Sequence, residues 1–110
     1  MTEPDYSVIK ADAQGNVIFY GKGAEKIFGY TPSEVMGKSV AMFHDPEEVA
    51  VLVPRLLKTA AETGRFEEEV YLVRKGGEKF RAKLTVVPIK RGNEIIGYTG
   101  ITDDLGRKGK

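Results

Sequence analysis

Cysteine and tryptophan are absent from this sequence, and His44 is its only histidine. A chain without cysteine forms no disulfide, has no thiolate nucleophile and holds no chromophore through a thiol. A single histidine rules out a histidine-rich metal site, and no paired-carboxylate motif on facing elements suggests acid–base catalysis. We therefore expect neither an enzyme nor a metal protein, and we assign no catalytic residue.

An excess of either sign of charge is also missing, because 17 Lys and Arg residues balance 16 Asp and Glu residues to a net charge of +1. This balance gives no electrostatic reason to expect a nucleic-acid partner or an anionic membrane. No apolar run approaches the roughly 20 residues of a membrane-spanning helix. Met1–Lys10 lacks the apolar stretch of a signal peptide. We expect a soluble, cytoplasmic chain, or a cytoplasmic piece of a longer one.

The length of 110 residues suits one domain rather than two. We expect residues 1–110 to form this single domain, with a core over about 5–105. Residues 106–110, "GRKGK", combine glycine with basic side chains, which is typical of a flexible tail or of the start of an output linker.

Alternating and β-branched patterns between glycine-containing turns predict five strands. Tight turns at "KGGE" and "RGN" join the last three strands, which favours antiparallel pairing in sequence order. Ala82, Leu84 and Val86 alternate with polar residues, so one face of this meander is apolar and helices should cover it. The expected strands are residues 6–11, 17–20, 66–73, 79–90 and 94–102.

Two short helices are expected between the second and third strands. Residues 24–28 carry apolar side chains at helical spacing, and Gly29 suits a left-handed helix end. Thr31 and Glu34 have the spacing of a capping box, which predicts a second short helix that ends at Gly37.

A longer helix is expected over residues 45–64, where Asp45 is a suitable N-cap and Gly64 a suitable end. Pro54 lies inside this segment, and an interior proline removes a backbone hydrogen bond at a cost of about 3 kcal/mol. The sequence therefore predicts a kink or break near residues 50–54, or a helix that begins there.

Taken together, these segments resemble the PAS sensor domain family. The resemblance covers roughly residues 5–108, and its most specific part is "GAEKIFGYTPSEVMG". It also includes "DAQGNVIFY", "DPEE", "VRKGGEKF", "KLTVVPIK" and "GYTGITDDL". The family implies an α+β fold in which a five-stranded antiparallel sheet is covered on one face by short helices and one longer helix. In the family, the short helices form one wall of a small pocket against the sheet.

The resemblance implies a non-enzymatic sensory or regulatory module. Such a module binds a small ligand, dimerises, or does both, and controls an output domain in the same chain, such as the histidine kinase of a two-component system. In the family the last strand often ends in an Asp-Ile-Thr motif that leads into an output helix. Here Asp103 takes the place of the aspartate, and Asp104 and Leu105 depart from the motif.

The implied ligand pocket lies between the helices and the inner face of the sheet, and most of its expected side chains are apolar. They are Phe28, Met42, Phe43, Leu52, Leu56, Phe66, Leu72, Ala82, Leu84, Val86, Thr99 and Ile101.

The cofactor is left open, with none as the first expectation. In the flavin-binding light sensors of the family a reactive cysteine forms the photoadduct, and the matching residue here is Val40, so a photoactive flavin is excluded. The family positions that hydrogen-bond the flavin ring correspond to Leu72, Ala82 and Ile101, which are all apolar.

A heme-binding gas or redox sensor is the alternative reading. The longer helix has no histidine to serve as an axial ligand, but His44 lies just before its start, close to the expected pocket mouth. His44 is either an axial heme ligand or a surface histidine beside Asp45.

Apolar side chains of the last three strands are also expected on the outer face of the sheet. In the family this face packs against an N-terminal segment or a second copy, so we expect a homodimer; scattered apolar surface residues are the alternative. Glu68 is expected to point toward the helices and to pair with Arg55 or Lys58. The expected dimer or output surface comprises Tyr71, Val73, Val87, Ile96, Tyr98 and Asp103.

Overall fold

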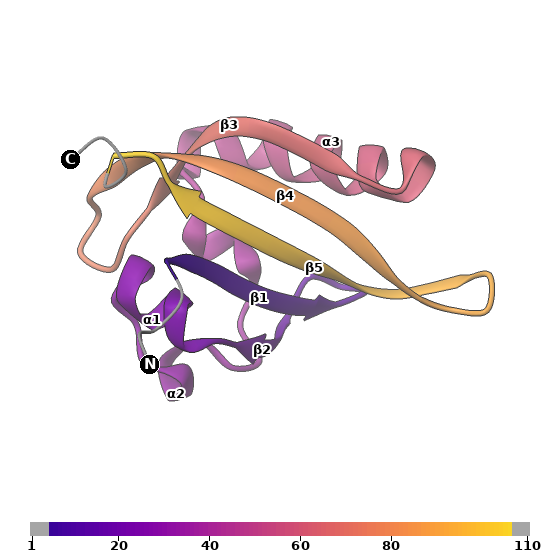
Figure 1. The fold of residues 1–110 in the computed structure, drawn as a ribbon, viewed down its shortest axis with the longest axis horizontal. Helices are drawn as coiled ribbons and strands as arrows, with labels where there is room; N and C mark the ends of the chain where they lie inside the picture. Colours follow the sequence, from indigo (N-terminus) through magenta and orange to yellow (C-terminus); the bar gives the residue numbers. More distant parts are fainter. Residues whose placement is uncertain (1–4, 107–110) are drawn as a thin grey trace.

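The last strand of the chain, β5 (Glu94–Asp104), lies at the centre of the sheet between β1 (Tyr6–Asp12) and β4 (Lys79–Arg91). Strands β2 (Val17–Tyr20) and β3 (Phe66–Val73) form the two edges, and every neighbouring pair is antiparallel. This is a computed structural model, and it describes residues 5–106 (Figure 1). The predicted α+β fold with a five-stranded antiparallel sheet is confirmed.

The helices of the described residues all occur between β2 and β3 in the chain. Figure 1 shows the long helix beside β3 and β4, and the short helices near β1 and β2. Among residues 5–106, none of these helices combines the length and apolarity that crossing a bilayer requires. They are α1 (Lys22–Phe28), α2 (Pro32–Val35), the 3₁₀ helix η1 (Val40–Phe43) and α3 (Pro46–Thr63).

The expected helix ends are present. Gly29 and Gly64 end α1 and α3 in the left-handed conformation, with φ of 86° and 87°. The backbone N–H of Thr31 donates to the Glu34 carboxylate before α2, at 2.8 Å. The Asp45 carboxylate caps α3 by accepting a hydrogen bond from a backbone N–H of its first turn.

Two of the outcomes predicted for Pro54, a break and a helix start near residues 50–54, are wrong, because α3 is continuous from residue 46 to residue 63 with Pro54 inside it. The kink stays a prediction. The N–H that proline lacks would otherwise bond the carbonyl of Ala50. Both residues are exposed, so water can satisfy this carbonyl, and the helix retains its other hydrogen bonds.

A register irregularity in the β4–β5 hairpin decides which residues face the helices. Lys90 pairs with Ile95, but the next pair is Ile89 with Gly97, so β5 contains one extra residue at Ile96. Beyond this point Val87 pairs with Thr99, whereas an uninterrupted register would pair Val87 with Tyr98. A shift of one residue exchanges the two faces of a strand.

The expected facing of three β5 residues is therefore wrong. Thr99 and Ile101 were expected in the pocket, but they share the outer face with Val87. Tyr98 was expected on the outer face, but it lies on the inner face in the same row as Ala11. The inner face of β5 instead presents Tyr98, Gly100, Thr102 and Asp104.

The core lies between the helices and this inner face. Phe28 at the end of α1 contacts Phe43 of η1 and Phe80 of β4, with ring centroids 4.8 and 5.7 Å apart. In the middle of α3, Arg55 forms two hydrogen bonds of 2.6 and 2.9 Å to Glu68 on β3. The predicted inward direction of Glu68 and its pairing with Arg55 are confirmed.

Candidate ligand cavity

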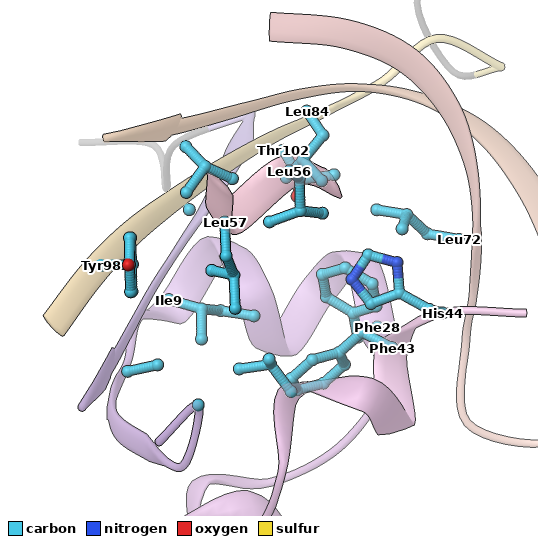
Figure 2. Close-up of a pocket in the computed structure, with 15 residues that line it drawn as sticks. Ile9, Phe28, Phe43, His44, Leu56, Leu57, Leu72, Leu84, Tyr98 and Thr102 are labelled. Carbon is cyan, nitrogen blue, oxygen red and sulfur yellow. The ribbon is translucent and has the colours of Figure 1, made fainter. Parts of the chain in front are cut away.

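A cavity of about 70 Å³ lies between the helices and the inner face of the sheet (Figure 2). The sheet contributes side chains from β1, β3, β4 and β5, and the helical side contributes α1, η1 and α3. α2 contributes no lining residue, so the expectation that both short helices wall the pocket holds for α1 alone. The unpredicted helix η1 takes the place of α2 in the wall.

Half of the expected pocket residues line this cavity. They come from α1, η1, α3 and the two strands at the β3 edge, and they are Phe28, Phe43, Leu56, Leu72, Leu84 and Val86.

The other expected pocket residues lie elsewhere. Leu52, Phe66 and Ala82 are buried in the core but do not border the cavity. Met42 is partly buried and packs against the core, and Thr99 and Ile101 lie on the outer face of the sheet. Eight lining residues were missed, for different reasons. Ile9, Ala11, Gly15 and Val40 were missed because β1, the 12–16 turn and the start of η1 were not assigned to the pocket. Tyr98, Gly100 and Thr102 were missed because of the shifted register of β5, and Leu57 of α3 was missed as well.

His44 is the one ionisable imidazole in the cavity wall. It is 8% exposed, its backbone bridges to Leu72 of β3, and its Nδ1 has no hydrogen-bond partner in residues 5–106. Burial without a compensating charge lowers the pKa of His44 to about 4, so the ring is neutral at pH 7. The reading of His44 as a solvated surface side chain is therefore wrong.

The cavity does not fit a heme or a flavin. Pockets for drug-sized ligands measure about 300–1,000 Å³, several times the 70 Å³ found here. Leu56, Leu72 and Leu84 line the same small cavity as His44. Within residues 5–106, no three His, Asp or Glu side chains gather into a metal-binding group.

The end of β5 is tied to the helices by an ion pair. Arg74, just after β3, donates from Nη2 to the carboxylate of Asp104 at 2.8 Å and from Nη1 to the carbonyl of Ile27 on α1 at 2.7 Å. Its guanidinium also stacks over Phe80, 4.0 Å from the ring centroid. Asp104 in turn accepts a hydrogen bond from the N–H of Gly106.

The buried aspartate at this exit is Asp104 rather than Asp103. Asp104 is 1% exposed and lies on the inner face, whereas Asp103 pairs across the outer face with Lys83 of β4. Asp103 was expected on the dimer or output surface and lies on the outer face, whereas the burial of Asp104 was not predicted.

The outer sheet face carries a group of apolar side chains. Tyr71 and Val73 on β3 and Val87 on β4 share this face, and Tyr71 and Ile96 are exposed. Exposed apolar side chains on β1 and β2 were not anticipated, namely Tyr6, Ile18 and Phe19.

Comparison with known proteins places this geometry in a family. A family model described as a PAS domain matches residues 4–106. The chain is 29% identical over 105 residues to two-component system protein A of Emericella nidulans, a match that covers 94% of this chain and 15% of that protein. It is 28% identical over 92 residues to blue-light-activated histidine kinase 2 of Erythrobacter litoralis, covering 83% of this chain and 27% of that one.

The fold is also found in solved structures. A PAS domain from Colwellia psychrerythraea superposes with a TM-score of 0.90 at 24% identity, over 96% of this chain and 90% of that one. The chain therefore spans nearly all of a solved domain, but less than a third of either curated relative.

Proposed function

Because the chain belongs to the PAS domain family, whose members are generally sensory and non-catalytic modules, we propose that it senses a small ligand in the cavity and signals through the end of β5. The observation that carries the proposal is the contact set of Arg74. This one side chain joins the helix that walls the cavity to the residue that ends the central strand.

The connection from cavity to exit is short. Phe28 borders the cavity and follows Ile27, whose carbonyl accepts a hydrogen bond from Arg74. Arg74 donates a hydrogen bond to the carboxylate of Asp104, and this carboxylate accepts another from the backbone N–H of Gly106. We propose that a ligand that moves Phe28 acts through these contacts on the guanidinium that fixes the end of β5. Such a switch requires that the ligand bind the two states with different affinity.

The receiver of this signal is proposed to be an output domain in the same chain, such as a histidine kinase, because the two curated relatives are several times longer than the matched segment. We also propose a homodimer through the outer sheet face, where Tyr71 and Phe19 leave apolar surface exposed beside the half-buried Val87. Heme is not proposed, because the cavity volume does not admit it.

The proposal is tested by filling the cavity with xenon, which enters apolar cavities, and recording amide spectra of the ¹⁵N-labelled chain. We expect saturable shifts at Gly100 in the cavity wall and also at Gly106. The shift at Gly106 should disappear in Arg74→Gln and persist in Arg65→Gln, which removes an exposed pair with Glu67. The proposal is contradicted if xenon does not shift the Gly106 amide signal of the wild type, or if it shifts this signal equally in Arg74→Gln.

A further inference from the structure

The cavity wall limits the charge of any ligand. Apart from the His44 imidazole, its lining side chains are apolar or carry a single hydroxyl, on Tyr98 and Thr102. No Lys, Arg, Asp or Glu side chain is among the lining residues of the described chain. A charged ligand would lose its hydration without gaining an opposite charge, so the wall selects an uncharged molecule.

The imidazole of His44 supplies an unmet hydrogen bond. A neutral imidazole has one donor and one acceptor nitrogen, and Nδ1 is buried without a partner in residues 5–106. Figure 2 shows the ring at one end of the cavity beside Leu72, with Ile9 and Leu57 across from it. A hydroxyl group both donates and accepts, so it matches the ring in either tautomer.

The volume limits the size of the ligand. A cavity of about 150 Å³ holds benzene, which has six carbon atoms. By the same proportion, the 70 Å³ found here holds about three non-hydrogen atoms. Water also has the size, but a buried water needs two to four polar partners around one point, and the polar side chains of this lining are limited to His44, Tyr98 and Thr102.

We propose that the cavity takes a short, uncharged hydroxyl compound of about three or four non-hydrogen atoms, with its hydroxyl on His44 and its carbon atoms against Phe28 and Leu57. This inference rests on the proposed function, since it names the ligand class of the same cavity. It adds that His44 selects the hydroxyl and that the small cavity volume favours short chains.

The test titrates ethanol, 1-propanol and 1-hexanol into the ¹⁵N-labelled chain. Ethanol and 1-propanol should give saturable shifts at Gly100 and Thr102 and a shift of the His44 ring nitrogens. 1-Hexanol should bind more weakly, although its greater apolar surface favours burial in general. Non-saturating shifts, shifts centred away from the cavity, or tighter binding of 1-hexanol would overturn the inference.

Two variants distinguish the contribution of the hydroxyl contact to alcohol affinity from that of the cavity volume. His44→Phe keeps a ring but loses the hydrogen bond, and we expect ethanol to bind roughly three- to tenfold more weakly. Gly100→Ala adds a carbon in the cavity wall, in ordinary contact 3.9 Å from Cδ1 of Leu84, and should weaken 1-propanol more than ethanol. Unchanged affinity in His44→Phe overturns the role of His44. If this variant does not fold, the ring-nitrogen shifts of the wild type decide the same point, because their absence on ethanol binding overturns that role.

The xenon and alcohol experiments together distinguish a failure of this inference from a failure of the proposed function. If xenon shifts Gly106 but the short alcohols do not bind, the ligand class is wrong and the sensory function stands. If the alcohols bind and Gly106 responds to neither probe, the ligand class stands and the signalling route is wrong.

Discussion

Arg74 and Asp104 form an ion pair of 2.8 Å in which the aspartate is 1% exposed and the arginine side chain 18% exposed. The pair spans 30 positions of sequence and joins the β3–β4 connection to the end of the central strand. Arg74 also bonds Glu78, whose side chain is 71% exposed, so a single guanidinium has one buried and one solvated partner. This arrangement provides a matched pair of variants.

Asp104→Asn should lower the free energy of unfolding by about 3 kcal/mol, because it leaves Arg74 without its buried counter-charge. Glu78→Gln should cost less than about 1 kcal/mol, because exposed ion pairs contribute little. Urea denaturation of both variants at pH 7 measures the difference. Equal losses would show that burial of Asp104 does not govern the strength of this contact.

His44 predicts a pH dependence of stability. Its pKa is lowered by burial from 6.5 to about 4, so the unfolded chain binds more protons between these values and stability falls as the pH falls. The loss between pH 7 and pH 5 should be about 2 kcal/mol. Urea denaturation at several pH values in this range measures it.

The control for this prediction is His44→Phe, whose stability should be nearly constant from pH 7 to pH 5. Paired carboxylates are accounted for by the same control, because the lysine partners and backbone N–H groups that lower the pKa values of Glu34 and Asp45 are present in both chains. Parallel pH profiles for the wild type and the variant would contradict the assigned burial of His44.

Gly97 is expected to be intolerant of a side chain. A Cβ at this position would lie 2.3 Å from the carbonyl oxygen of Ala11, because β1 and β5 approach closely beside the irregularity in the hairpin. Gly97→Ala should therefore lower the free energy of unfolding by about 2 kcal/mol or more. At Gly100 the nearest backbone atom would be 3.7 Å away, so Gly100→Ala should be tolerated far better. Similar thermal unfolding of the two variants would argue against this packing of β1 on β5.

The outer sheet face is expected to mediate self-association. Val87→Asp places a charge on this face and should weaken the dimer at least about tenfold while leaving the fold intact. Val51→Asp is the control, because Val51 is 73% exposed on α3. Sedimentation equilibrium measures both. A chain that is monomeric at all concentrations, or that responds equally to both changes, would contradict the assignment of the face.

The local elements were predictable from the sequence because each has its own physical signature. Alternation marked the strands, and Thr31, Asp45 and Gly64 marked helix ends by their capping chemistry. The five-stranded topology was predicted from the family resemblance. The hairpin of β1 and β2 and the meander of β3, β4 and β5 do not by themselves indicate that β5 pairs with β1. The continuity of α3 through Pro54 depended on solvent exposure, which periodicity did not reveal.

The candidate site was predictable only in part, because its composition depends on register. One extra residue at Ile96 moved Tyr98 into the cavity wall and moved Ile101 out of it. Gly97 stands directly beside this irregularity, and a glycine inside a strand pattern suggests a bulge, but the expected strand 94–102 did not allow for one. The burial of His44 depended on its pairing with Leu72, a contact between segments far apart in the sequence.

Hydrogen exchange at the exit tests the coupling of the cavity to the end of β5 most directly. The Leu105 N–H donates a hydrogen bond to the carbonyl of Arg81, and the Gly106 N–H donates one to Asp104. The exchange rates of both amides therefore report on local opening at the end of β5. With xenon in the cavity, their exchange rates should change severalfold in the wild type and remain unchanged in Arg74→Gln. A change confined to cavity amides such as Gly100 and Thr102, with Leu105 and Gly106 unaffected in the wild type, would contradict the account.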